Sequence, residues 1–366
     1  MSDVPVFCVV KIEGEEITDL VRRLEVEESD SLADVAKLVL GDDNLVLGDV
    51  LHEGLSVEID LGRPDEHAVV FRGLVTGVVS SVGGRSPNVE LTATDALISL
   101  SLRARTKRWW NTPVSGIVRE IAVANSLLPG RIEPEQDAIV AEFAPEQQVE
   151  ETDLALLQRL AGRFDSKVFV EHTGPVDSLN FVSTRKLLEA EPLDQQLVFN
   201  ANISDFRAGF DAYATAGETR VVSTDPKTGE TVDLAEKLLV PTEAAWVPDA
   251  ARIGRLGEGA ARVSALVARA AAKRARVTEF WRVPPRAAGA PARASSDRSL
   301  TLGDRSRRLG QSARGRAAGS ISFRPRTRVR VEGVGGRWSG LWYMARVRHE
   351  LELGRRTYDT SFLCTR

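Results

Sequence analysis

The chain has 366 residues, of which 43% are hydrophobic and 27% are charged. At about 150 residues per domain this length predicts two or three domains, each able to bury a core. No run approaches the roughly 18 apolar residues that a membrane-spanning helix needs, so we expect no insertion into a membrane. The first residues lack a basic segment followed by an apolar run, which predicts synthesis in the cytoplasm without a signal peptide.

The net charge of -4 conceals a strong partition along the chain. Residues 252–366 hold 26 basic and 8 acidic residues, whereas residues 1–251 hold 22 basic and 44 acidic residues. Such asymmetry indicates charged partners. A basic region that binds nucleic acid is one interpretation, and an acidic face that meets the basic face of a neighbouring subunit is the other.

The two cysteines, Cys8 and Cys364, lie near opposite ends of the chain. Two cysteines cannot form a disulfide framework. Cys8 lies in an apolar alternation, which favours a small buried thiol over a bridge between the termini.

Residues 1–103 predict a β domain. Apolar and polar residues alternate over 55–61 and again over 89–94, as expected of half-buried strands. The segment 68–82 between them is rich in β-branched residues. Many short strands at this spacing favour a sandwich or a barrel. Earlier strands are predicted at 5–12, 20–27 and 34–40.

Residues 104–200 predict a small α+β domain. Thr112 followed by Pro113 is typical of a helix start. Thr152 is expected to cap a second helix, with Asp153 in its first turn. Strands are predicted at 167–171 and 178–183.

Residues 201–366 return to β structure. Two β-branched segments around Asp225-Pro226-Lys227-Thr228-Gly229 predict a hairpin over 220–232. A helix is predicted over about 257–276, and the Pro-, Ala- and Arg-rich segment 284–298 predicts an exposed loop. The final strands are predicted at 320–323, 327–332, 340–347 and 357–364.

The order of several sequence segments resembles a known family. FRGLV at 71–75 is followed by VELTATD at 89–95, by WWNT at 109–112 and by QQVEETDLALL at 147–157. Near the end come VEGV, WSGLWY and YDTSF, at 331–334, 338–343 and 358–362. Over essentially the whole chain this order is similar to the phage late control protein D family. Its members are baseplate hub proteins related to the first part of valine-glycine-repeat spike proteins.

This resemblance implies a mainly β fold with an α+β insertion. Two tail-tube-like β-barrel domains, 1–103 and 201–366, would be joined by an α+β connecting domain, 104–200. Three copies would place six barrels in a ring that matches a hexameric inner tube on one side and a trimeric spike on the other. Spike-fused relatives continue into further domains, whereas this sequence ends at Arg366 after the last expected hub strand. We therefore expect the spike to be a separate polypeptide.

Enzymatic signatures are weak. The four histidines show no metal-binding spacing, and no nucleophile elbow or phosphate-binding loop is present, so we expect no catalytic site, metal, cofactor or small-molecule substrate. Glu150, Glu151 and Asp153 are candidates for an acid/base pair that would cleave cell-wall glycans. Helix-start chemistry explains the same residues, and a tail-associated cell-wall hydrolase remains the alternative function.

Four alternating arginines and two tryptophans are the candidate contacts between subunits. The arginines are expected to share one face of a strand, with Val329 and Val331 facing inward. Such a stripe can neutralise phosphates, but it lacks the interleaved aromatic residues of a stacking surface. We therefore favour contacts with the acidic surface of an adjacent subunit over nucleic acid. The candidates are Arg324, Arg326, Arg328, Arg330, Trp109 and Trp110.

The sequence thus predicts a non-enzymatic, homotrimeric baseplate hub of a contractile phage-tail-like injection system. Its expected partners are the inner tube protein, a spike protein and other baseplate components. The protein is expected to assemble in the cytoplasm and to become part of the particle. The sequence leaves open whether this particle is a phage, a tailocin, or an extracellular or membrane-anchored injection device, and it does not identify the cargo.

Overall fold

In a computed structural model, the chain divides into two compact units. The first comprises residues 1–206, 314–330 and 342–364, and the second comprises 207–313, 331–341 and 365–366. The structure describes residues 6–83, 86–135, 137, 146–172, 174–210, 219–224, 231–236, 254–255, 257–269, 286–288 and 310–366. Among these residues, no helix is both long enough and apolar enough to cross a membrane.

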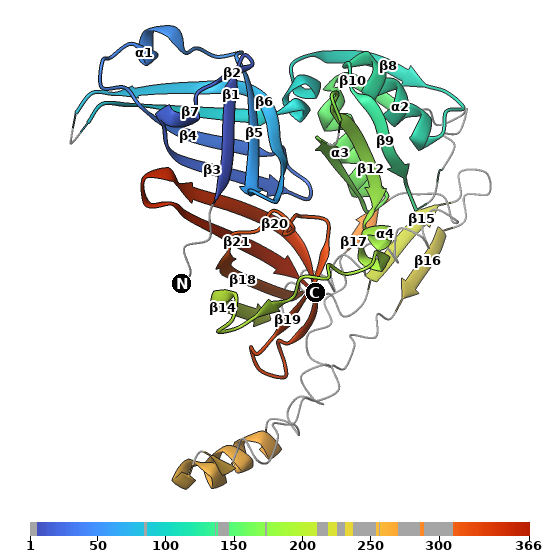
Figure 1. Cartoon of the computed structure of the whole chain (residues 1–366). Coiled ribbons are helices and arrows are strands. Elements are labelled where there is room, and N and C mark those ends of the chain that lie inside the picture. Colours follow the sequence, from blue (N-terminus) through green and yellow to red (C-terminus); the bar gives the residue numbers. More distant parts are fainter. Residues whose placement is uncertain are drawn as a thin grey trace. The chain divides into compact units, whose positions relative to one another are not determined.

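The first unit begins with an antiparallel sheet (Figure 1). Its strand order is β3-β4-β7-β6-β5-β1-β2. A short 3-10 helix, η1 (Thr18–Leu20), precedes β3, and α1 (Leu47–Val50) precedes β5. The strands are β1 (Phe7–Ile12), β2 (Glu15–Glu16), β3 (Val21–Ser29), β4 (Val35–Gly41), β5 (Ser56–Arg63), β6 (Glu66–Ser81) and β7 (Asn88–Asp95).

The period-two pattern of the sequence explains the core of this sheet. On β5, Val57, Ile59 and Leu61 are buried, while the polar residues between them face the other side. Phe71 on β6 and Leu91 on β7 join the same core. The predicted β region is confirmed, because each of its expected strands forms within a few residues of the expected position.

An α+β region follows. The 3-10 helix η2 (Ala96–Ser101) leads into β8 (Ala104–Trp109), which pairs with β10 (Glu146–Thr152). A second sheet has the order β11-β12-β9. Helices α2 and α3 pack their apolar faces into a core of their own. The remaining bounds are α2 (Val114–Ala124), β9 (Leu128–Glu133), α3 (Asp153–Arg163), β11 (Ser166–Glu171), β12 (Ser178–Ser183) and α4 (Thr184–Glu189).

The two predicted helix caps have different outcomes. The side chain of Thr152 accepts a hydrogen bond from the backbone N–H of Ala155 at 3.2 Å, so the predicted cap of α3 is confirmed. The predicted cap of α2 is wrong. Pro113 is the residue that precedes α2, and the hydroxyl of Thr112 instead donates to the backbone carbonyl of Trp110.

The C-terminal strands extend the first sheet. β20 pairs antiparallel with β3, with His349 opposite Val26, and the path continues through β21 and β18 to β14. The mainly β fold is confirmed. In the part of the chain that the structure describes, however, the N-terminal and C-terminal β regions share one open 13-stranded sheet and do not form two separate closed barrels. The elements are β13 (Leu197–Val198), β14 (Ile203–Phe210), β18 (Gln311–Ala318), β19 (Arg328–Glu332), β20 (Gly340–Glu352), η4 (Leu353–Arg355) and β21 (Thr357–Thr365).

One expected strand of this region is wrong. Residues 320–323 contain a turn and no strand, while β21 pairs with β20 and with β18, which is earlier in the sequence. Phe323 is buried without belonging to a strand. Cys8 and Cys364 are both free thiols, so the alternative of a bridge between the termini is also wrong.

The second unit contains a small sheet with the order β16-β15-β17. β15 (Thr219–Thr224) and β16 (Thr231–Glu236) pair antiparallel, which confirms the predicted hairpin. β17 (Arg286–Ala288) pairs parallel with β15 and is a strand inside the expected loop 284–298. The 3-10 helix η3 (Gly257–Gly259) precedes a helix over 260–269, within the range predicted as helical. The turn at 225–229 and the rest of both predicted segments lie outside the described residues.

Candidate functional site

A group of charged residues, most of them buried, lies within the first unit, where three parts of the sequence meet. Its members come from β3 and the turn after it, from the end of β7, and from the C-terminal segment 319–327 and β20. We call this group the charged junction: Glu28, Asp34, Asp95, Arg324, Arg326 and His349.

Glu28 is the centre of the charged junction. Its side chain is fully buried, and its Oε2 accepts hydrogen bonds from Arg324 Nη2 at 2.7 Å and Arg324 Nε at 3.0 Å. On the other side, His349 Nε2 lies 3.3 Å from Glu28 Oε1. The second ring nitrogen of His349 contacts the hydroxyl of Tyr358 at 2.9 Å. Glu28 therefore connects the first sheet to the C-terminal part of the chain through Arg324 and His349.

The electrostatics of Glu28 show which interaction dominates. Burial alone would raise the pKa of this carboxyl, but Arg324 and then His349 stabilise the ionised form and bring the pKa down to about 2. Glu28 is thus a buried carboxylate that stays ionised at neutral pH because its charge is paired. Removing the partner of such a buried carboxylate strongly destabilises the folded protein.

Arg326 connects the C-terminal segment to the two other parts of the first unit. Its backbone adopts a left-handed conformation, with φ of 68°, which is uncommon outside glycine and indicates that the surroundings hold it in place. The buried guanidinium donates to the backbone carbonyl of Ser29 at 2.6 Å. It also lies over the ring of Phe169 on β11, 4.2 Å from the ring centre.

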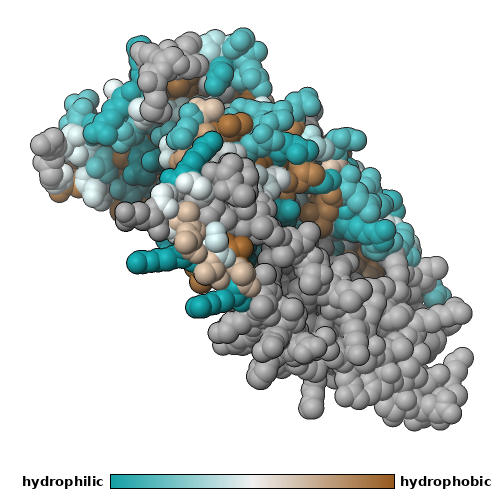
Figure 2. Space-filling view, turned by 90° about the horizontal axis from the view of Figure 1, so that it is seen from below, coloured by the Kyte–Doolittle hydropathy of each residue, from teal (hydrophilic) through white to brown (hydrophobic). Residues whose placement is uncertain are grey.

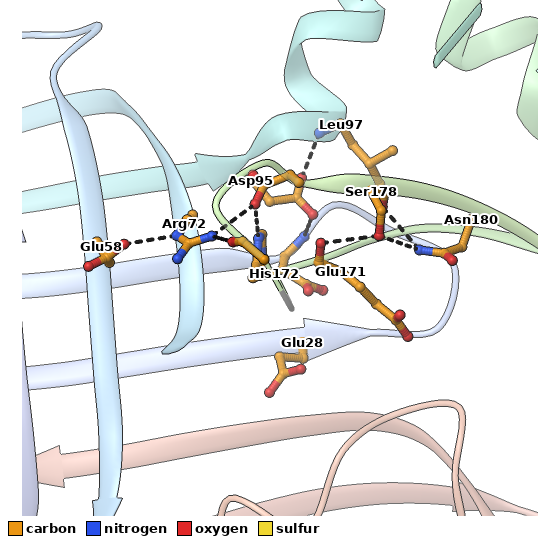
Figure 3. A network of polar contacts seen from close by, with 12 residues as sticks. Glu28, Glu58, Arg72, Asp95, Leu97, Glu171, His172, Ser178 and Asn180 are labelled. Carbon is orange, nitrogen blue, oxygen red and sulfur yellow. Dashed lines mark hydrogen bonds and ion pairs between the residues drawn. The ribbon is translucent and has the colours of Figure 1, made fainter. Parts of the chain in front are cut away.

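The tip of the β11–β12 hairpin provides a second polar attachment. Arg72 on β6 donates to Glu58 Oε2 at 2.8 Å and to the backbone carbonyl of Gly174. His172 is buried, and its Nδ1 lies 3.0 Å from Asp177 Oδ1. Figure 3 shows Arg72 between Glu58 and His172, with Asp95 close by. The first sheet therefore contacts the α+β region through paired charges as well.

The predicted arginine stripe is not a single strand face, because β19 begins only at Arg328. Arg324 and Arg326 precede the strand and have partners inside the chain. Arg328 lies on the strand and donates to the carbonyl of Ala190 at 3.1 Å, and Arg330 is exposed. Val329 and Val331 are buried, as predicted.

The two predicted tryptophans lie in different environments. Trp109 is only 2% exposed and packs in the core of the α+β region, with the ammonium of Lys107 over its ring. Trp110 is 49% exposed. Of this pair, Trp110 is the one that the isolated chain leaves accessible to a partner.

Two of the three carboxylates considered for glycan cleavage, Asp153 and Glu151, have partners near the start of α3, and Glu150 is exposed. Asp153 is buried and accepts from Arg105, from Asn125 and from Gln148. Glu151 is paired with Arg159 at 2.8 Å. Asp153 thus has the structural role at the helix start that the sequence favoured over an acid/base role.

Sequence reasoning missed the charged junction. The sequence pattern singles out none of His349, Glu28 and Asp34. The only sequence signal is that Glu28 lies next to Glu27 on β3, where the period-two pattern directs one of two adjacent glutamates toward the interior. Its partner Arg324 lies 296 residues away, and a local pattern cannot identify a partner at that separation.

Figure 2 shows one face of the molecule, on which the coloured residues are mostly hydrophilic, with separate hydrophobic patches between them. Exposed apolar side chains include Val46 and Val50 in and beside α1, Val123 at the end of α2 and Val149 on β10. A recess of about 640 Å³ is lined by residues of η1, β3 and η4, among them Arg22, Arg23 and Arg355.

Comparison with known proteins places this geometry in context. A model of the family described as phage tail baseplate hub (GPD) matches residues 34–354. No curated protein matches the sequence.

Solved structures with the same fold are tail and secretion proteins. A tail protein from Neisseria meningitidis MC58 has a TM-score of 0.68 and 14% identity, covering 99% of this chain and 97% of that one. The 43 kDa tail protein of prophage MuSo2 from Shewanella oneidensis has a TM-score of 0.66 and 13% identity, covering 98% and 97%. An E. coli protein has a TM-score of 0.58 and 12% identity, covering 97% and 76%. It is described as a type VI secretion system component with structural similarity to the T4 bacteriophage tail proteins gp27 and gp5.

Proposed function

The chain belongs to the phage tail baseplate hub family, and we propose that three copies of it form an adaptor between a hexameric inner tube and a trimeric spike. The family assigns it a structural role in the baseplate of a phage or tail-like particle. In this proposal it is made in the cytoplasm, contacts other baseplate components and performs no catalysis. The domain division 1–103, 104–200 and 201–366 is part of the same proposal.

The pairing of β3 with β20 is the observation that carries this proposal. Seven successive residue pairs, from Arg346 with Ser29 to Glu352 with Arg23, connect the N-terminal and C-terminal β regions of one polypeptide. Two β regions that stand edge to edge within each chain give six such regions in three chains. This arithmetic supports a molecule that matches sixfold symmetry on one side and threefold symmetry on the other.

The exposed candidates supply a surface for contacts between copies. Arg328 and Arg330 present positive charge on β19, and Trp110 presents an exposed aromatic ring. Acidic side chains are exposed around α1, including Asp49 and Glu53. In a closed ring each chain uses two different surfaces, one for each neighbour. We propose that the basic surface of one copy meets the acidic surface of the next, which fits the charge partition of the sequence.

The stoichiometry is tested by native mass spectrometry and by light scattering of the purified full chain. We expect a trimer whose dissociation increases with salt, because ions screen contacts between exposed charges. Arg330→Glu should weaken the trimer, whereas the control Arg185→Glu, on the exposed side of α4, should not. A monomer at every concentration would contradict the trimer. A trimer that is insensitive to salt would refute only the charge contribution.

The adaptor role needs a test with partners. The hub is mixed with the tube protein and the spike protein encoded beside it, and the complexes are imaged by cryo-electron microscopy. We expect a hexameric tube ring on one side of three hubs and a spike on the other. Binding of neither partner to a stable trimer would refute the adaptor role.

A further inference from the structure

Asp34 is a buried carboxyl group with few hydrogen bonds to offset the cost of its burial. It is 2% exposed and follows the turn after β3. Among the described residues, its carboxyl group accepts one hydrogen bond, from the backbone N–H of Ser29 at 2.8 Å. The neighbouring carboxylate of Asp95 accepts two, from the N–H groups of Asp34 at 3.1 Å and Leu97 at 3.0 Å. Asp95 is therefore the better solvated member of this pair.

The charges around Asp34 do not balance. The carboxyl groups of Asp95, at the end of β7, and Glu28, on β3, act on Asp34. The guanidinium groups of Arg326 and Arg324 act on it from the C-terminal segment. Arg324 is hydrogen-bonded to Glu28, so two arginines are shared among three buried carboxyl groups, those of Glu28, Asp34 and Asp95. A third buried negative charge beside two cations is costly, and binding a proton removes that cost.

The remaining nearby groups do not change this balance for Asp34. His172, at the end of β11, acts on Asp95 and is paired with Asp177. Lys167 on β11 is paired with Asp30 at 2.8 Å. His349 on β20 faces Glu28. Each of these cations or potential cations has another carboxylate as its direct partner.

We propose that Asp34 keeps its proton at neutral pH, so that the contact between the β3–β4 turn and the C-terminal segment depends on proton binding. Burial, which outweighs Arg326, raises the pKa of Asp34 well above its ordinary range, and Asp95 adds to this rise. Burial also raises the pKa of Asp95, to about 6. The pair thus holds at least one proton under conditions in which surface carboxyls hold none.

The sign of the effect follows from proton linkage. A carboxyl whose pKa is raised by folding binds a proton in the folded chain that the unfolded chain has already lost. Between the unfolded and folded pKa values, the unfolding constant therefore rises tenfold for each unit of pH. The charged junction should be more stable at mildly acidic pH and less stable as the solution becomes alkaline. The packing of the C-terminal segment on the first sheet is thereby sensitive to pH.

Two measurements on the full chain test this proposal. Infrared difference spectra between the wild type and Asp34→Asn at pH 7.5 should show the C=O stretch of a protonated carboxylic acid in the wild type. Thermal unfolding is followed from pH 5 to pH 9 for the wild type, Asp34→Asn and Asp65→Asn. Asparagine keeps the acceptor for Ser29 and cannot ionise. Asp65, exposed in the turn between β5 and β6, is the matched control.

The unfolding constant of the wild type should rise by up to tenfold for each pH unit. Asp34→Asn should lack this rise, and its melting temperature at pH 8 should be higher than that of the wild type. Asp65→Asn should retain the wild-type slope. If Asp34 is ionised and paired with Arg326, Asp34→Asn will instead melt below the wild type at pH 8 and keep its slope, which overturns the proposal. If Asp34→Asn does not fold, wild-type spectra recorded between pH 5 and pH 9 decide. If the folded protein shows no carboxylic acid band at pH 7.5, the proposal is refuted.

Discussion

The apolar core of the first sheet and the charged junction beside it both contain buried side chains, yet they are specified in different ways. The core is made of side chains such as Leu38 and Ile59, which any apolar neighbour of suitable size can cover. The charged junction is made of Glu28 and its two partners, and each atom must face a particular donor. Burying side chains therefore costs little free energy in the apolar core. In the charged junction it costs much more, unless each charge meets its partner.

This difference separates stability from specificity. A hydrophobic core holds a sheet together but says little about which further segment packs against it, because the hydrophobic effect has no direction. The charged junction accepts only a segment that brings Arg324 and His349 to Glu28. We infer that it selects how the C-terminal segment docks on the first sheet, a role documented for some buried polar groups in other proteins.

The largest expected effect is that of Glu28→Ala. This substitution leaves Arg324 and His349 buried without their shared anion, and the expected loss of unfolding free energy is about 3–5 kcal/mol. Urea unfolding at pH 7 measures it. A loss below about 1 kcal/mol, as for a surface ion pair, would mean that water reaches these residues in solution.

Leu38→Ala should cost slightly less. Removing three carbon atoms from the core of the first sheet is expected to cost about 2–5 kcal/mol, depending on how far the cavity collapses. Because no charge is involved, this loss should be the same at pH 5 and pH 8. A clear pH dependence of the Leu38→Ala effect would show that the core and the charged junction are energetically coupled.

Acid should affect the charged junction selectively. Folding lowers the pKa of Glu28 from 4.5 to about 2, because Arg324 and His349 outweigh burial. The stability that this group contributes is present above about pH 4.5 and is lost as the pH falls toward 2. Acid unfolding curves should therefore be less steep for Glu28→Gln than for the wild type. Equal slopes would place the acid sensitivity elsewhere.

The smallest effect is expected at Glu27, one residue from Glu28 on the same strand. Glu27 pairs with Arg348 at the surface, with Arg348 Nε 2.9 Å from Glu27 Oε2. Glu27→Ala should cost about 0–1 kcal/mol, and the cost should vanish at high salt. An effect as large as that of Glu28→Ala would show that this face is also covered in the functional assembly.

Much of the fold was predictable because the relevant signals are local. The alternation at 55–61 identified β5 and its buried face, and Thr152 identified the start of α3. The prediction at Thr112 failed because a threonine before a proline can also donate to a nearby carbonyl. The strand at 320–323 failed because Phe323 is buried from a turn, and burial alone does not make a strand.

The candidate contacts were predicted less completely. Alternation placed Arg328 and Arg330 correctly on a strand, with Val329 inward. It could not show that Arg324 and Arg326 turn into the protein, since that depends on the backbone conformation of Arg326 and on Ser29 and Phe169, which lie far away in the sequence. Nor could the sequence distinguish Trp109 from Trp110.

The sequence by itself determined the strands β1 to β7 with their apolar faces, except the two-residue β2, and the hub family, because periodicity and motif order act over a few residues or along the chain. Only the tertiary structure decided that β20 pairs with β3 and that Glu28 lies between Arg324 and His349. Ionic partners separated by about 300 residues are chosen by the packing of whole segments, and the energy of a buried charge depends on every group around it.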